Sequence, residues 1–276
     1  MSTHQFETHQ PVNLYVENGS GSVNIQADDT TETTVKISGR HADEAIVTQD
    51  GDQISVLAPK MRAGFLGGDT KLDMEITVPA DSTLVVKTGS ADVTARGSYR
   101  AGQVKSGSGD VTIEIMDGPA VVETGSGDIR VDTADQELRI KSGSGDVRVQ
   151  YAGGAVTIST GSGDVEIGTN NAPAVVKTGS GDLNVVESRD DVAMTTGSGD
   201  FVIRSASRGR LTAKGASGDV HVGIPTGVPI WTDVSTVSGQ IRSSLEGAGE
   251  PEEGADHVEL RAKSVSGDIV LTQVES

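Results

Sequence analysis

The chain has 276 residues, a net charge of −18, 36 glycines, no cysteine and an aromatic content of 3%. The lack of cysteine excludes disulfides and cysteine-ligated metals. The negative charge argues against binding to nucleic acid or to anionic lipid, because phosphate contact requires clustered Lys and Arg. Scarce aromatics and the lack of a long helical period argue against a globular α/β enzyme. No apolar run approaches the roughly 18 residues of a membrane-spanning helix.

The first 80 residues predict strands that follow no fixed spacing. Pairs of apolar residues that alternate with polar ones are found at Leu14 and Val16, Val23 and Ile25, Val35 and Ile37, Ile54 and Val56, and Met74 and Ile76. We therefore expect an N-terminal irregular β cap over residues 1–80. The polar start, Met1 to Gln10, lacks the apolar stretch of a secretion signal, so we expect a cytoplasmic protein.

Aspartates then recur every 18 residues, and each closes a turn. The seven are Asp92, Asp110, Asp128, Asp146, Asp164, Asp182 and Asp200. Six of the turns read Gly-Ser-Gly-Asp, and the first reads Gly89-Ser90-Ala91-Asp92. A fixed period of this length is typical of stacked repeat units.

Each repeat contains two short stretches of alternating apolar and polar residues. Val147 and Val149 follow one turn, and Val156 and Ile158 precede the next. This alternation indicates two half-buried strands per repeat. In a parallel solenoid each residue lies over the residue 18 positions later, about 4.8 Å away, whereas an antiparallel meander would leave an apolar face that no predicted helix covers. We predict an all-β chain, with a regular β-solenoid (parallel β-helix-like) of 18-residue, two-strand coils over residues 81–222 and irregular terminal caps.

The repeat degrades toward residue 222. The spacing slips to 19 at Asp219, and later copies of the turn, Ser238–Ile241 and Ser266–Ile269, are more widely spaced. Between them residues 245–257 carry five acidic residues and no Lys or Arg, which indicates a surface loop. We predict a C-terminal cap over residues 223–276, with the lone Trp231 packed over the end of the core.

The aspartate ladder is the candidate site, and two interpretations are open. Carboxylates about 4.8 Å apart in a ladder repel by roughly 1 kcal/mol per neighbour in water. Either a bound cation such as calcium or hydrogen bonds from backbone N–H groups would offset this repulsion. Calcium-binding β-rolls repeat a similar turn about every nine residues, but here only one of the two turns of a coil carries it. We favour a structural turn over a cation site.

The other polar columns do not form a catalytic set. Ser108 and its equivalents recur with the turn, and no histidine recurs beside them. The Thr or Ser directly before each turn, such as Thr124 and Ser142, is expected to hydrogen-bond within the turn. The five histidines show no spacing typical of metal ligands. We predict no catalytic residue and no cofactor, and therefore no enzyme.

These properties indicate a non-enzymatic structural or interaction protein. We expect a rigid β-ladder surface that meets a protein partner or a second copy of the chain. The alternative is a calcium-binding or carbohydrate-binding solenoid.

Several motifs resemble a known bacterial family. They are the repeated Thr-Gly-Ser-Gly-Asp-Val, the opening Pro11-Val12-Asn13-Leu14-Tyr15-Val16, the step Ile76-Thr77-Val78-Pro79 and the closing Ser264-Val265-Ser266-Gly267-Asp268-Ile269. The chain is similar over nearly its whole length to the "putative adhesin" β-strand-repeat family, a domain of unknown function, and in particular to its actinobacterial members without a signal peptide. The resemblance implies a β-helical stack, and it supplies no catalytic residue or ligand.

Overall fold

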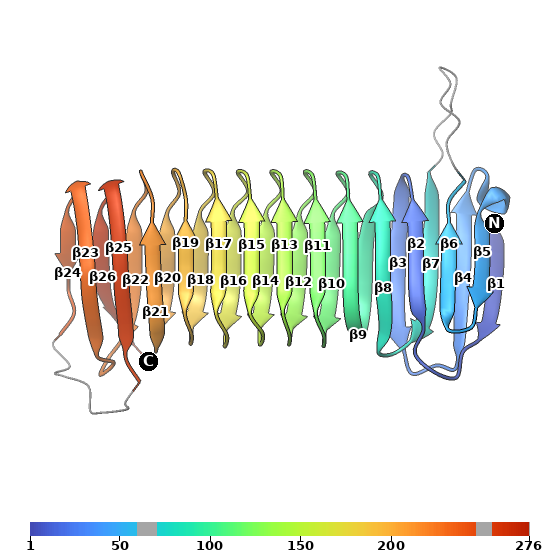
Figure 1. Ribbon diagram of the computed structural model, residues 1–276, viewed down its shortest axis with the longest axis horizontal. Helices are drawn as coiled ribbons and strands as arrows, with labels where there is room; N and C mark the ends of the chain where they lie inside the picture. The colour runs from blue at the N-terminus through green and yellow to red at the C-terminus, as the bar shows by residue number, and fades with distance from the viewer. Residues whose placement is uncertain (60–70, 247–255, 276) are drawn as a thin grey trace, which may run out of the picture. The chain divides into compact units, whose positions relative to one another are not determined.

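The computed structural model describes residues 1–59, 71–246 and 256–275. Within these ranges the chain is built from β-strands, with one short 3₁₀ helix, η1 (Ala42–Glu44). The chain divides into two compact units, residues 1–137 and residues 138–276. Figure 1 labels their strands.

Unit 1 consists of two rows of hydrogen-bonded strands, each strand paired with the next in its row. The first row is β1 (Ser2–Glu7), β4 (Glu32–Gly39), β7 (Leu72–Pro79), β3 (Gly21–Asp28), the first part of β9 (Asp92–Ser106), β10 (Val111–Met116) and β12 (Ile129–Ala134). The second row is β5 (Ile46–Asp50), β6 (Gln53–Leu57), β2 (Asn13–Asn18), β8 (Ser82–Thr88), the second part of β9 and β11 (Ala120–Thr124). The pairs β1–β4, β4–β7 and β5–β6 are antiparallel, and the others are parallel.

Strand β9 serves both rows of unit 1 because it bends in its middle. Gly97 lies at the bend with φ 87°, and a Cβ there would be 2.4 Å from the carbonyl oxygen of Ala27. The buried Tyr99 follows, and its hydroxyl donates to the carbonyl oxygens of Arg96 at 2.8 Å and Ile25 at 3.1 Å. Burial raises the pKa of Tyr99. The tyrosine therefore joins the bend to the neighbouring coil.

Unit 2 consists of two rows of parallel strands. The first row is β13 (Leu138–Ser142), β15 (Val156–Thr160), β17 (Ala174–Thr178), β19 (Val192–Thr195), β21 (Gly209–Lys214), β25 (Val258–Ser266) and β23 (Ile230–Ser238). The second row is β14 (Val147–Ala152), β16 (Val165–Asn170), β18 (Leu183–Ser188), β20 (Phe201–Ala206), β22 (Val220–Pro225), β26 (Ile269–Val274) and β24 (Ile241–Ser243).

The register in the regular part of each unit follows the 18-residue period. Val147 pairs with Val165 in unit 2, and Val111 pairs with Ile129 in unit 1. Each residue therefore lies beside its equivalent in the next coil. This register confirms the solenoid and excludes the meander, in which equivalent residues would be two strands apart.

The core lies between the two rows of each unit. Inward residues of the regular coils, such as Val149, Val156 and Ile158, are at most 1% exposed. Burial of each such side chain contributes roughly 1.5–3 kcal/mol. The residues between them, such as Arg148 and Thr157, face outward and are exposed.

The last coils of unit 2 do not follow chain order. Strands β25 and β26 pair on one side with β21 and β22 and on the other side with β23 and β24. The later segment of the chain is thus inserted next to the regular array, and the earlier segment, residues 230–243, forms the last coil. In Figure 1 this coil is the one labelled β23 and β24.

The expected position of Trp231 is wrong. Trp231 is 52% exposed and lies beside the outward-facing Glu259. The inward positions of β23 are instead Ile230 and Val234, because these pair with the buried Val258 and Ala262. The alternation of the strand therefore places the indole on the outer face rather than over the core.

Two further expectations concern segments and spans. Of the acidic stretch 245–257, residues 247–255 lie outside the described residues. None of the helical segments among the described residues has the length and hydropathy needed to cross a membrane.

Substituting Val147 with Asp tests the assignment of the core. Val147 is 1% exposed, so the variant buries an unpaired carboxylate and should lose several kcal/mol in the free energy of unfolding, about 3 or more. Urea denaturation measures the loss. Arg148→Ser is the control, because it removes only the exposed ion pair with Glu166, which is worth about 1 kcal/mol at most. Equal losses in the two variants would contradict the assignment.

Candidate functional site

The turn after β15 shows how a ladder aspartate is positioned. Strand β15 ends at Thr160, the chain turns through Gly161, Ser162 and Gly163, and β16 begins directly after Asp164. The parallel register of β16 and β18 then places Asp182 beside Asp164 in the next coil. Equivalent turn residues of successive coils therefore lie in columns, as equivalent strand residues do.

Within each unit, ladder carboxylates accept backbone hydrogen bonds from the next coil. The amide of Asp182 donates to Oδ1 of Asp164 at 2.9 Å. The same bond links the pairs Asp92 and Asp110, Asp110 and Asp128, Asp146 and Asp164, and Asp182 and Asp200, at 2.8 to 2.9 Å. A hydrogen bond to a charged group contributes about 1.5–3 kcal/mol, which is enough to offset the repulsion between neighbouring carboxylates.

The ladder continues into the last coils of unit 2. The amide of Asp219 donates to Asp200 at 2.7 Å, that of Asp268 to Asp219 at 2.8 Å, and that of Gln240 to Asp268 at 2.9 Å. The residues joined by these three bonds are 19, 49 and 28 positions apart in the sequence. The ladder therefore follows the order of the coils in space and not their order in the chain. The sequence showed these three positions as late copies of the turn, but their irregular spacing did not place them in the ladder.

Glycine is required in these turns by the closeness of successive coils. A Cβ at Gly163 would lie 2.0 Å from the carbonyl oxygen of Gly145, and one at Gly161 would lie 2.4 Å from that of Gly143. Real Cβ atoms do not approach backbone so closely, so any side chain here would force the coils apart.

The buried column of Thr and Ser before each turn closes the turn from inside. Threonine accepts from the second glycine, as in Gly163 N–H to Thr160 Oγ1 at 3.1 Å, whereas serine donates, as in Ser142 Oγ to the carbonyl oxygen of Gly145 at 2.9 Å. Thr196 Oγ1 has no partner among the described residues. Its glycine, Gly199, instead donates to the carbonyl oxygen of Ser217 at 3.1 Å, where the spacing slips by one residue.

The polar groups of the ladder and its turns make hydrogen bonds to the backbone. One oxygen of each linked carboxylate accepts a backbone hydrogen bond. Hydroxyls such as those of Thr160 and Ser142 are hydrogen-bonded to the backbone of their own turn. The histidines are dispersed, and Nδ1 of His41 lies 2.8 Å from a carboxylate oxygen of Glu44. Across the part of the chain that the structure describes, no three His, Asp or Glu side chains gather closely enough to hold a metal ion.

A second feature is the outward face of the first row of unit 2, which we call the basic face. On strands β13, β15, β17, β19, β21, β25 and β23, the outward charged residues are Arg139, Lys141, Lys177, Arg210, Lys214, Arg261, Lys263, Glu259 and Asp233. Seven of these are basic and two acidic, in a chain whose net charge is −18. Lys214 and Lys263 are direct cross-strand neighbours. The excess of Lys and Arg on this face can be found in the sequence, but only by comparing the outward positions of every second strand along the chain.

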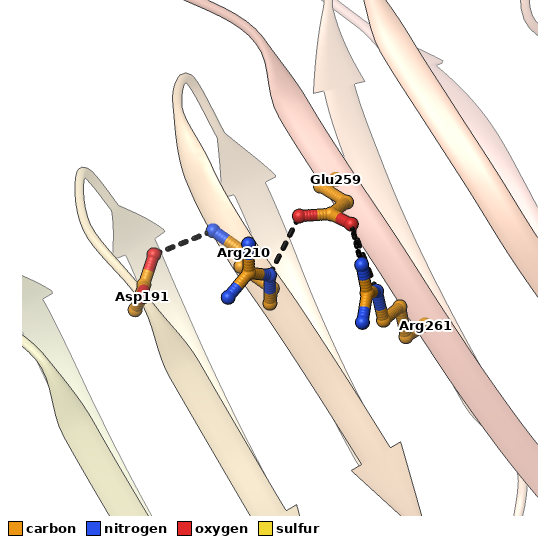
Figure 2. A network of polar contacts seen from close by, with 4 residues as sticks. All are labelled: Asp191, Arg210, Glu259 and Arg261. Carbon is orange, nitrogen blue, oxygen red and sulfur yellow. Dashed lines mark hydrogen bonds and ion pairs between the residues drawn. The ribbon is translucent and has the colours of Figure 1, made fainter.

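One end of the basic face holds a network of charged side chains (Figure 2). Arg210 donates from its backbone N to Asp191 at 2.7 Å and from Nε to Glu259 at 2.6 Å. Arg261 also donates to Glu259 and lies 5.8 Å from the centre of the Trp231 ring. Hydrogen bonds from Arg210 and then Arg261 lower the pKa of Glu259. The network spans three coils and depends on the insertion of β25, so sequence reasoning could not find it.

Substitutions at Asp164 test whether the ladder is a structural turn. Asp164→Asn keeps an oxygen that can accept from the amide of Asp182, so it should cost about 1 kcal/mol or less. Asp164→Ala leaves that amide without its acceptor and should cost about 1–3 kcal/mol. Urea denaturation with and without calcium measures both.

The two variants should keep this order in calcium and in chelator alike. A large stabilisation of the unsubstituted chain by millimolar calcium, abolished in Asp164→Asn, would instead show a cation site. Calcium at about 100 times its dissociation constant would add roughly 2.7 kcal/mol.

Comparisons with known proteins found similar solved structures and a matching family. A solved structure titled as a putative adhesin from Bacteroides fragilis is 13% identical, covers 99% of this chain and 96% of its own, and has a TM-score of 0.40. One titled as a putative lipid binding protein from Parabacteroides distasonis is 15% identical, with coverages of 99% and 96% and a TM-score of 0.37. No curated protein matches. The family described as Toastrack DUF4097 matches residues 12–186 and again residues 153–272, and the chain therefore belongs to the Toastrack DUF4097 family.

Proposed function

We propose that the protein acts without catalysis, by presenting the basic face of unit 2 as a rigid surface to an acidic protein partner. The observation that carries the proposal is the excess of Lys and Arg on this face of a strongly acidic chain. Charge separation of this kind steers oppositely charged partners and favours their association.

The fold suits such a surface because its side chains are held at a regular spacing. Parallel strands lie about 4.8 Å apart, so residues on alternate coils are about 10 Å apart. Lys141 and Lys177 lie on one line that crosses the strands, and Lys214 and Lys263 continue that line. An extended acidic segment could therefore meet several cations with little loss of conformational freedom by this protein.

The groups that could carry out chemistry have structural tasks instead. The ladder carboxylates accept backbone hydrogen bonds, and the Thr and Ser hydroxyls close the turns. This supports an interaction protein rather than an enzyme.

Charge reversal on the basic face tests the proposal. The variant Lys177→Glu, Lys214→Glu should lose at least about tenfold in capture of the partner, because attraction becomes repulsion. Affinity purification from the native cell, with the captured proteins identified, measures this loss. A partner bound through the face should be acidic and should elute as salt is raised, since salt screens exposed charges.

The control carries the same change of charge elsewhere. Lys36→Glu, Arg204→Glu alters exposed residues that are not on the basic face, and it should capture the partner as the unsubstituted chain does. Equal capture by all three proteins would overturn the proposal, and so would capture of nucleic acid in place of a protein.

A further inference from the structure

The last coil of unit 2 ends in two strand edges that have no partner among the described residues. Strand β23 pairs only with β25, and β24 only with β26. Its inward residues are incompletely covered: Ile230 and Val234 are half-buried, and Ile241 is 50% exposed. In the coils beside it, the corresponding Val258, Ala262 and Ile269 are fully buried. The core of unit 2 is therefore open at this coil.

The exposed apolar residues of the described chain gather at the last coil and the coil beside it. Of the seven large hydrophobic side chains that are exposed, four lie on β23, β24 and β25, namely Trp231, Val237, Ile241 and Val265. Natural edge strands are usually protected by charges, prolines or bulges. Strand β23 has one charged residue, Asp233, and no proline. The last coil as a whole, residues 230–243, carries one acid and one base, so the charge that keeps copies of this chain apart is missing here.

The sequence of β23 is complementary to itself in an antiparallel arrangement. When two copies pair about a two-fold axis at Val234, Trp231 lies opposite Val237 of the other copy. The same register places Val234 against Val234, Thr232 against Thr236, and Asp233 against Ser235. The two most exposed apolar groups of the strand thus cover each other, and no like charges meet. Residues directly opposite share a face of the sheet, so the inward valines also close the core.

A second copy is the occupant that fits both edges at once. The two edges belong to two sheets whose spacing is fixed by the coil, and an identical coil offers the same two edges at the same spacing. An edge of nine residues is about 30 Å long, and two sheets with their side chains are about 20 Å thick, so each copy would bury on the order of 600 Å². The total of about 1,200 Å² is at the lower limit of stable interfaces.

We infer that the protein forms a two-fold symmetric dimer in which β23 of one copy adds, antiparallel, to β23 of a second copy, with β24 meeting its own copy in the other sheet. A two-fold contact of this kind uses the same surface on both copies and is therefore closed, so it produces dimers and not filaments. The inference goes beyond the proposed function, because it concerns the strand edges of the last coil and not the basic face.

Paired cysteine variants test the register directly, because the natural chain contains no cysteine. Trp231→Cys and Val237→Cys are purified separately, mixed and oxidised gently. Directly opposite residues fall within the roughly 4.4–6.8 Å between Cα atoms that a disulfide requires, so the mixture should form a disulfide-linked dimer. Neither variant alone should do so, because residue 231 lies about 20 Å from its own equivalent in this register.

Val186→Cys provides the matched control, since Val186 is also exposed, at 40%, but lies on β18 away from the edge. Mixed with either variant, it should remain unlinked. A mixture of Trp231→Cys and Val237→Cys that stays monomeric on a non-reducing gel would overturn the inference, as would cross-linking of either variant with itself to the same extent.

Sedimentation across micromolar to millimolar concentrations gives a second readout. The unsubstituted chain should reach a dimer and stop there. Val237→Lys, at a side chain that is 83% exposed, should fold normally and weaken the dimer at least tenfold, whereas Val186→Lys should not. Growth beyond the dimer would show head-to-tail contacts and contradict the two-fold arrangement. Failure of the dimer would leave capture of an acidic partner by the basic face unchanged, so the two proposals fail separately.

Discussion

The turn of every regular coil must close within the spacing of a single step of the β-ladder. At Gly163 and its equivalents, even a methyl group would lie well inside the van der Waals contact distance to the preceding turn's carbonyl oxygen. Glycine at these positions thus lets the parallel strands of successive coils keep their hydrogen-bonding distance. Everything else in the repeat follows from this contact: equivalent side chains are stacked in columns, the inward columns are aliphatic, and the outward columns form ladders.

Stacking brings equal charges together, and the aspartate column shows how the fold accommodates them. The carboxylate of Asp164 accepts the amide of Asp182, so the group that would repel its neighbour also binds the neighbour's backbone. The bond needs a short side chain with an acceptor oxygen at the residue that closes the turn, and aspartate supplies it. The same bond joins Asp219 to Asp268 across a break in chain order. It therefore marks which coils are adjacent, independently of sequence spacing.

The period and alternation of the sequence were sufficient to predict the solenoid, its two-strand coils and its inward columns such as Val147 and Val165. They could not show the insertion of β25 and β26 beside the regular array, because the repeat turns at Ser238 and Ser266 look alike and either could lie next to Asp219. The position of Trp231 was missed for a related reason. Which residues of β23 face inward depends on where its alternation of inward and outward residues begins, and the degenerate repeat does not show this. The basic face was readable in principle from Lys141, Lys177 and Lys214, but net charge concealed it.

The structure thus separates a scaffold, in which the ladder holds the coils in place, from two surfaces, the basic face and the last coil. The scaffold is the central claim, and hydrogen exchange of the ladder amides tests it most directly. Although their side chains lie at the surface, the backbone amides of Asp164, Asp182 and Asp200 should exchange as slowly as that of Val165, which is bonded to the carbonyl oxygen of Asp182. Exchange of these three amides at the rate of an open, solvated turn would contradict the account.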